Sequence, residues 1–181
     1  MSTQPTPYPT RAALALEAAS QRELELAFQR GTTPNLDDLV GWEFRGINRI
    51  PTDVVAKLTG IKKFVKGFHR ADDGRVLGYN TPVGKNALDG RWLAQTKRFG
   101  FYEVTPVDPT ARDNAYLHAV LLDYSKGDNP TFDVTRNLRD YLVQVDPANP
   151  DLFLGNASFA VGPARISYVL GYFVLERWRR N

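Results

Sequence analysis

The side chains best suited to chemistry lie in one short stretch, residues 116–124. If this stretch is a β-strand, its alternation places Tyr116, His118 and Tyr124 on the same face. A histidine between tyrosines on a cavity wall would bind a ligand hydroxyl or carboxylate, or transfer a proton. The alternative is a neutral histidine that is hydrogen-bonded within a polar patch. A single bulge before Tyr116 would change which face points inward.

Other strands offer further candidate ligand-binding residues. Tyr102 and Tyr172 have rings that give an apolar body with a polar tip, which suits the orientation of a ligand in an apolar pocket. The same tyrosines could instead pack with their hydroxyls at the rim. Arg45 and Arg139 are charged residues within strand patterns. Either arginine could bind a carboxylate ligand, or pair with Asp140 as a structural bridge.

Several classes of chemistry are excluded by the sequence. With no cysteine, the chain has no thiol nucleophile, no disulfide and no thiolate metal site, and two histidines make a histidine-rich metal site improbable. We find no phosphate loop, no dinucleotide fingerprint and no Gly-x-Ser-x-Gly motif. The paired aspartates Asp37-Asp38 and Asp72-Asp73 fit turns and helix caps. We therefore expect no metal and no cofactor, and His118 is the candidate catalytic residue should the protein be an enzyme.

The charge and hydropathy of the sequence limit the classes of partner and the location that we expect. The net charge is only +3, and the basic clusters at residues 62–66 and 177–180 are interpreted as solvated faces, which argues against nucleic acid as a partner. The first residues lack the basic and apolar regions of a signal peptide, and no apolar run approaches the roughly 18 residues of a membrane span. These features predict a cytoplasmic protein. The sequence does not decide between a monomer and a homodimer.

One longer helix is expected before the β-strands. Residues 1–9 contain three prolines and predict a flexible tail, and Thr10 can cap a helix over residues 11–30 that ends at Gly31. Its apolar face follows helical spacing through Ala13, Leu16, Leu24, Ala27 and Phe28. Ser20 interrupts that face. The helix either packs on the outside or end of the sheet, or binds a partner.

From residue 41 onward, short strand patterns alternate with turn residues. A second short helix is predicted over residues 52–58, and Asp73-Gly74 and Asp89-Gly90 are turn signals. The strand patterns cover residues 42–47, 61–68, 75–79, 99–105, 116–124, 137–145, 152–160 and 166–178, and a further short segment follows the second turn at 92–95. This spacing predicts a mainly β, antiparallel up-and-down barrel or a sandwich, in a single domain over residues 10–181.

Three stretches resemble the lipocalin-like (calycin) barrels, in particular uncharacterised bacterial members. They are Gly41-Trp42 with Arg45-Gly46, residues 139–145 followed by Leu152-Phe153-Leu154-Gly155, and the terminal residues 172–177. The resemblance spans roughly residues 37–177, with Gly-Trp in place of the usual Gly-x-Trp. It implies an up-and-down barrel around a cavity for a small apolar molecule.

Together these observations favour an intracellular barrel that binds a small hydrophobic or aromatic metabolite. One alternative is a biosynthetic isomerase or cyclase in which His118, Tyr116 or Tyr102 transfers protons. Another is an interaction domain without a ligand, which would use its helix. The sequence does not identify the ligand, and fold alone does not establish function.

Overall fold

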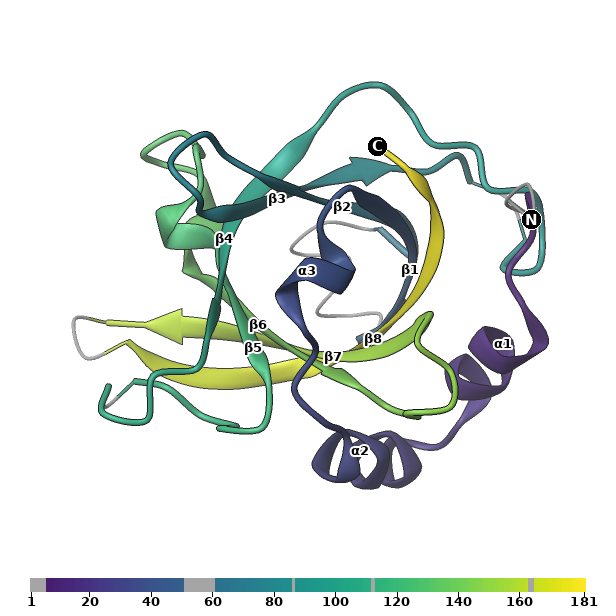
Figure 1. Ribbon diagram of the computed structural model, residues 1–181, viewed down its shortest axis with the longest axis horizontal. Helices are drawn as coiled ribbons and strands as arrows, with labels where there is room; N and C mark the ends of the chain where they lie inside the picture. Colours follow the sequence, from purple (N-terminus) through teal and green to yellow (C-terminus); the bar gives the residue numbers. More distant parts are fainter. Residues whose placement is uncertain (1–5, 51–60, 86, 112, 163–164) are drawn as a thin grey trace.

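The computed structural model describes residues 6–50, 61–85, 87–111, 113–162 and 165–181 (Figure 1). Its helices are α1 (Arg11–Ala18), α2 (Gln21–Arg30) and α3 (Leu36–Leu39), with 3-10 turns η1 (Tyr124–Lys126) and η2 (Val134–Asn137). Its strands are β1 (Trp42–Arg49), β2 (Lys63–Arg70), β3 (Val76–Pro82), β4 (Phe99–Pro106), β5 (Val120–Asp123), β6 (Leu138–Gln144), β7 (Leu152–Val161) and β8 (Ile166–Arg180). The predicted helix at residues 52–58 lies outside the described residues.

The strands form one closed antiparallel barrel, which confirms the predicted fold class. Each strand pairs with the next along the chain, and β8 returns to pair with β1 over eight residue pairs from Trp42↔Arg180 to Arg49↔Tyr172. Closure leaves no long unpaired sheet edge around the wall, which is how such barrels avoid edge-to-edge association. The Asp73-Gly74 turn joins β2 to β3 as predicted, with Gly74 at φ +86°. The segment at residues 92–95 contributes an isolated bridge, Val83↔Ala94, and no barrel strand.

The helical region at residues 11–30 is confirmed, but it consists of two helices and not one. The chain leaves helical geometry at Ala19 and Ser20. The Ser20 hydroxyl accepts a hydrogen bond from the backbone N–H of Glu23, and the Glu23 carboxylate accepts one from the backbone N–H of Ser20. This capping box starts a new helix at Gln21. The serine that interrupted the predicted apolar face is therefore the N-cap of α2.

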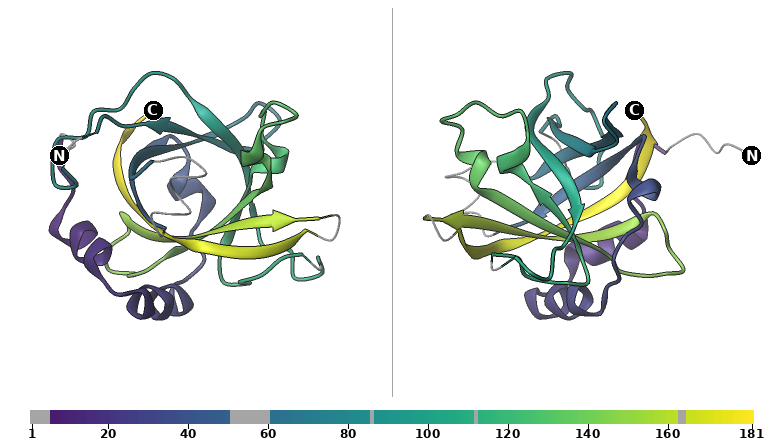
Figure 2. Two further views of the ribbon diagram at one scale, coloured as in Figure 1. Left: turned by 180° about the vertical axis from the view of Figure 1, so that it is seen from behind. Right: turned by 60° about the vertical axis from the view of Figure 1, so that its left-hand side comes forward.

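Both helices lie outside the barrel wall (Figure 2). Leu24 and Phe28 of α2 are fully buried against the outward-facing residues of β6, β7 and β8, which include Tyr141, Leu154 and Val174. The predicted packing of this helical region on the outside of the sheet is thus confirmed. The described part of the predicted tail also lies against the wall, because Arg45 donates hydrogen bonds to the backbone carbonyls of Thr6 and Tyr8.

The interior of the barrel has two halves. At one end, α3 lies across the opening, and its Leu39 is buried with Phe44, Phe68 and Phe153 in the interior core (Figure 1). The ring of Phe44 packs edge-on against those of Phe68 and Phe153, at centroid distances of 5.3 and 5.5 Å. This half is closed and apolar. The opposite half, where β2 and β6 begin, contains a cavity.

Among the described residues, no helix combines the length and the apolar character that a membrane crossing requires.

Candidate functional site

The cavity has apolar walls and a polar floor. The walls are formed by strand residues and by two isoleucines that flank β1 and β2, namely Phe64, Phe99, Leu138, Ala157, Leu170 and Phe173, with Ile50 and Ile61. The floor is formed by Lys66 of β2, Asn80 of β3, Tyr124 of η1 and Asp140 of β6. We call these four residues the polar floor. A mostly apolar pocket with a few convergent polar groups is the usual form of a small-molecule site.

A cation and an anion meet in the polar floor. The Lys66 Nζ lies 3.2 Å from Asp140 Oδ2, and the two side chains are 2% and 6% exposed. Lys66 also donates to the Tyr124 hydroxyl at 2.5 Å and to Asn80 Oδ1 at 3.1 Å. The Tyr124 hydroxyl donates to Asp140 Oδ2 at 2.9 Å, so tyrosine and lysine share one carboxylate oxygen. Asn80 is held in turn by a hydrogen bond to the carbonyl of Gly100.

Two oxygen atoms at the cavity receive no hydrogen bond from the described residues. The described residues provide no hydrogen bond to Asp140 Oδ1, because every bond to that carboxylate goes to Oδ2. Thr135 also lines the cavity, and its buried hydroxyl makes no hydrogen bond to the described residues. Buried polar atoms without partners are uncommon and costly, so a ligand that bonds to the Thr135 hydroxyl would be stabilised there, and Asp140 Oδ1 offers a second acceptor.

Aromatic rings surround the lysine ammonium. Its Nζ lies 4.6 Å from the ring centroid of Tyr102, 5.1 Å from Tyr124 and 5.2 Å from Phe173. These distances allow cation–π attraction, which partly replaces the lost hydration of the charge.

Burial shifts the titration of the polar floor toward neutral forms. It lowers the pKa of Lys66 and raises that of Asp140, and in each case the charge of the partner opposes the shift. Burial also raises the pKa of Tyr124 well above its ordinary value, with the Asp140 carboxylate adding to the effect. The lysine and aspartate therefore lie closer to sharing a proton than two such groups in water.

Strand alternation explains why a lysine lies inside the barrel. On β2, Phe64, Lys66 and Phe68 point inward, while Val65 lies outside beneath Trp92. On β1, Gly46 leaves room for the Phe64 ring, because a Cβ there would lie 2.2 Å from a ring carbon.

Two of the residues predicted to bind a ligand lie in this interior. Tyr124 is part of the polar floor, and Tyr102 is buried beside it with ring centroids 5.1 Å apart. The Tyr102 hydroxyl donates to the backbone carbonyl of Gly67 at 3.2 Å. The predicted inward face of residues 120–124 is thus confirmed, with Val120 and Leu122 in the interior core.

Tyr116 and His118 are not in the cavity, and the expected strand over residues 116–124 is wrong in its first half. Strand β5 begins only at Val120, because Tyr116 adopts φ +54° and its carbonyl accepts a turn hydrogen bond from the N–H of Ala119. Both side chains pack on the outside against Phe28, at centroid distances of 5.1 and 5.7 Å. The His118 Nε2 lies 3.0 Å from the Phe28 carbonyl oxygen.

Tyr172 is also on the outer face, 5.9 Å from Phe28 between ring centroids. Its predicted grouping with Leu170 on one face fails because the pairing of β7 with β8 shifts register after Ala157. The shift occurs at Gly171 and reverses the alternation, so Leu170 and Phe173 line the cavity while Tyr172 faces the helices. Such a bulge changes which face a side chain joins.

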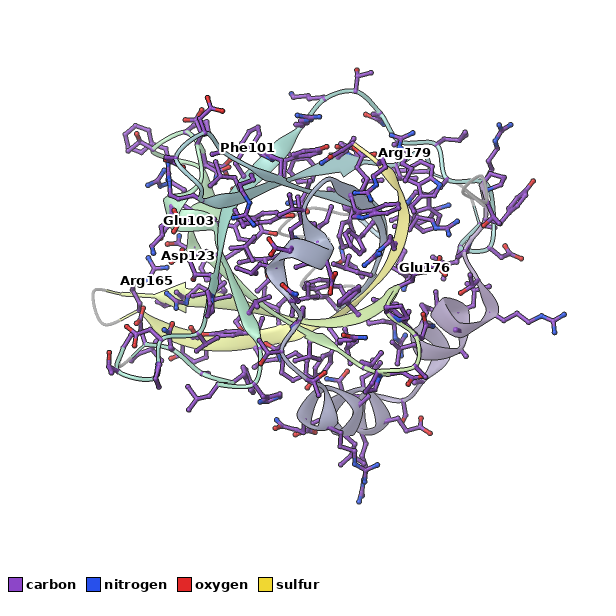
Figure 3. The ribbon with its side chains drawn as sticks, viewed as in Figure 1. Phe101, Glu103, Asp123, Arg165, Glu176 and Arg179 are labelled. Atoms are coloured by element: carbon purple, nitrogen blue, oxygen red, sulfur yellow. The ribbon has the colours of Figure 1, made fainter. Side chains whose placement is uncertain are left out.

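Arg45 and Arg139 also point outward, and neither pairs with Asp140. Arg45 forms a buried ion pair with Glu176 at 2.9 Å. Arg139 pairs with Asp113 at 2.8 Å and lies 3.7 Å from Asp123. Figure 3 shows Glu176 and Asp123 on opposite sides of the barrel. Both arginines thus tie outer segments to the wall.

Sequence reasoning missed Lys66, Asn80 and, as a site residue, Asp140. The prediction that the cluster at residues 62–66 is a solvated face is wrong for two of its lysines, since Lys63 and Lys66 are 5% and 2% exposed. A signal was present: Lys66 lies midway between Phe64 and Phe68 at strand spacing, which is the pattern of an inward-facing position.

The sequence matches no protein-family model, and no curated protein matches it.

Proposed function

We propose that this barrel binds a small, mostly apolar molecule in its interior cavity, with one polar group of that molecule at the polar floor. The observation that carries the proposal is the Lys66–Asp140 pair, which forms the base of a cavity with otherwise mostly apolar walls. Taking two charges out of water is costly, and hydrophobic residues of similar volume would often serve stability as well or better. A pair exposed to a cavity suits ligand recognition better than it suits packing.

The size of the cavity limits the ligand. Its volume is about 80 Å³. Since one water molecule needs roughly 10–15 Å³ by the same measure, the cavity has room for about six waters. A single ring or a short branched chain matches this space.

Polar complementarity limits the ligand further. Asp140 Oδ1 and the Thr135 hydroxyl can accept a hydrogen bond, and Lys66 can donate one by giving up a bond to Asn80 or Tyr124. A hydroxyl or carbonyl group at one end of an apolar body satisfies this floor. The closed eight-stranded barrel and the resemblance to calycins support the same assignment, and membership of that superfamily and a cytoplasmic location are part of the proposal.

The test is calorimetric titration with 4-methylbenzyl alcohol, together with native mass spectrometry of the purified protein for any retained molecule. A matched pair of variants identifies the site, because Leu138 lines the cavity whereas Leu93 is exposed on an outer loop. We expect Leu138→Trp to weaken binding at least about tenfold, and Leu93→Trp to leave it unchanged. Equal binding by both variants would place the ligand elsewhere. A wild-type protein that neither binds the alcohol nor retains a molecule would contradict the proposal.

A further inference from the structure

We propose that Lys66 is a nucleophile that forms an imine with a small apolar aldehyde or ketone bound in the cavity. This inference rests on the proposed function, and it names the ligand class as carbonyl compounds. It gives the barrel a covalent chemistry in which Asp140 transfers the protons and the Tyr124 hydroxyl positions the lysine and the aspartate.

The first support is geometric. Lys66 extends from the middle of β2 to the base of the cavity, and its amine is held by three partners: Asp140, Tyr124 and Asn80. A carbonyl ligand that occupies the cavity meets this amine at the end of the apolar walls. A fixed nucleophile facing a bound electrophile removes much of the entropic cost of a bimolecular reaction.

The second support is the proton-transfer machinery. An imine needs one group that accepts the amine proton and one that donates a proton to the departing oxygen. Asp140 Oδ2 lies within 3.2 Å of the amine, and the Tyr124 hydroxyl contacts both of them. A nucleophile, a base and a third orienting group are therefore in mutual hydrogen-bond contact, which is the usual arrangement of an activated nucleophile.

The step balances with the groups present. The Lys66 ammonium first passes one proton to Asp140 Oδ2, 3.2 Å away, which leaves a neutral amine and a carboxylic acid. The nitrogen lone pair attacks the carbonyl carbon, and the carbonyl oxygen takes the Asp140 proton. The nitrogen then returns one proton to Asp140, which gives a neutral carbinolamine. Asp140 protonates the hydroxyl, the C–O bond breaks and water leaves. The nitrogen lone pair forms the C=N bond, and the protonated imine faces the Asp140 carboxylate.

A neighbouring lysine on the same strand provides contrast. Lys63 points to the outside, where its Nζ lies 4.2 Å from the Trp92 ring centroid and donates to the Ala87 carbonyl at 3.0 Å. It is buried, yet it does not line the cavity. Burial thus does not distinguish the two lysines, whereas the cavity, the carboxylate and the tyrosine do.

The experiment is reductive trapping of the full chain with 4-methylbenzaldehyde and sodium cyanoborohydride, followed by intact mass measurement and peptide mapping. We expect one reduced adduct at Lys66, formed at least about tenfold faster than any adduct at the exposed Lys126. An excess of 4-methylbenzyl alcohol, which has the same skeleton without the carbonyl, should slow this adduct in proportion to its occupancy. Asp140→Asn should slow the trapping at Lys66 about tenfold or more while the rate at Lys126 stays constant.

The outcomes separate the two proposals. If the alcohol binds but Lys66 gains no adduct, or gains it no faster than Lys126, imine formation is overturned and the binding function stands. Trapping at Lys66 that the alcohol does not slow also overturns it, because the reaction would then not need the cavity. Calorimetry on Asp140→Asn with the alcohol shows whether that variant keeps its cavity. If it does, an unchanged trapping rate removes Asp140 from the mechanism and overturns the proposal as stated.

Discussion

The interior cluster around Lys66 and the outer cluster around His118 are both built from tyrosine and phenylalanine rings, yet they hold their polar groups differently. In the outer cluster, His118 contacts a backbone carbonyl of α2, and its neighbouring rings pack against Phe28. In the interior cluster, a charged pair faces a cavity and a carboxylate oxygen receives no bond from the described residues. Aromatic rings near a titratable group therefore do not identify a site by themselves. A cavity next to the titratable group is what identifies the site.

The largest expected effect comes from breaking the interior pair. Lys66→Met leaves Asp140 buried without its counter-charge, and the loss of one partner from such a pair typically costs about 3–5 kcal/mol. Urea unfolding at pH 7 measures it. The double variant Lys66→Met with Asp140→Leu should recover most of that loss, since no charge is left unpaired. If Lys66→Met is as stable as the wild type, the Lys66–Asp140 pair contributes little to the free energy of unfolding.

The outer cluster should respond in stability alone. Phe28 is fully buried and contacts Tyr116, His118 and Tyr172, so Phe28→Ala should cost about 3 kcal/mol through the cavity it leaves. Binding of 4-methylbenzyl alcohol should be unchanged below the unfolding temperature, because the wall separates this cluster from the interior. A parallel loss of binding would show that the helices shape the cavity, and would erase the distinction between the two clusters.

The pH dependence of Lys66→Met sharpens the comparison. Burial already raises the pKa of Asp140 above the ordinary value of 3.8, and loss of the lysine charge removes the main effect that opposes the rise. Tyr124 and Tyr102, which face this carboxylate, stay neutral because burial raises their pKa as well. Between 3.8 and its raised pKa, Asp140 binds a proton in the folded state and not in the unfolded state, so stability falls as pH rises through that window.

We therefore expect the stability of Lys66→Met relative to wild type to fall as the pH rises above 3.8, and to stop falling once the pH has passed the raised pKa of Asp140. Chemical denaturation at several pH values measures the loss. Lys126→Met, at an exposed position, is the control and should follow the wild-type profile. A flat difference between Lys66→Met and wild type would mean that Asp140 gains water or another donor once the lysine is gone.

The sequence predicted the barrel and its helical covering, because turn residues and strand spacing are local signals. Asp73-Gly74 specifies a hairpin whatever the rest of the chain does. It predicted the site less well, because a site depends on which face points inward. That choice was correct for Tyr124, and it failed for Tyr172, where a bulge at Gly171 reverses the alternation. A one-residue shift is invisible to a pattern of period two.

Lys66 shows a second limit. A lysine within a basic cluster is expected to be exposed to solvent. Lys66 is buried because it pairs with Asp140, 74 positions later in the chain, which offsets the cost of burying its charge. That pairing is a property of the closed barrel and has no local signature. His118 shows the reverse error, since a residue type associated with catalysis occupies a packing position outside the wall.

The smallest expected effect comes from His118 itself. The sequence alone predicts that His118→Ala lowers ligand affinity and leaves stability nearly unchanged, whereas its position predicts the opposite. The side chain is partly exposed, and it contributes one contact to the Phe28 carbonyl and one edge contact to the Phe28 ring. Loss of a single hydrogen bond of this kind costs about 0.5–1.5 kcal/mol.

We expect His118→Ala to lower the free energy of unfolding by about 1 kcal/mol and to leave the binding of 4-methylbenzyl alcohol and the trapping rate at Lys66 unchanged. His118→Gln, whose side-chain amide can donate to the same carbonyl, should recover part of the stability. Urea unfolding and calorimetry on the two variants measure both quantities. The reasoning is that a contact to α2 stabilises the docking of that helix, while the barrel wall lies between His118 and the cavity. Reduced affinity at unchanged stability would assign His118 to the ligand after all, and the interior would no longer be the site that this comparison selects.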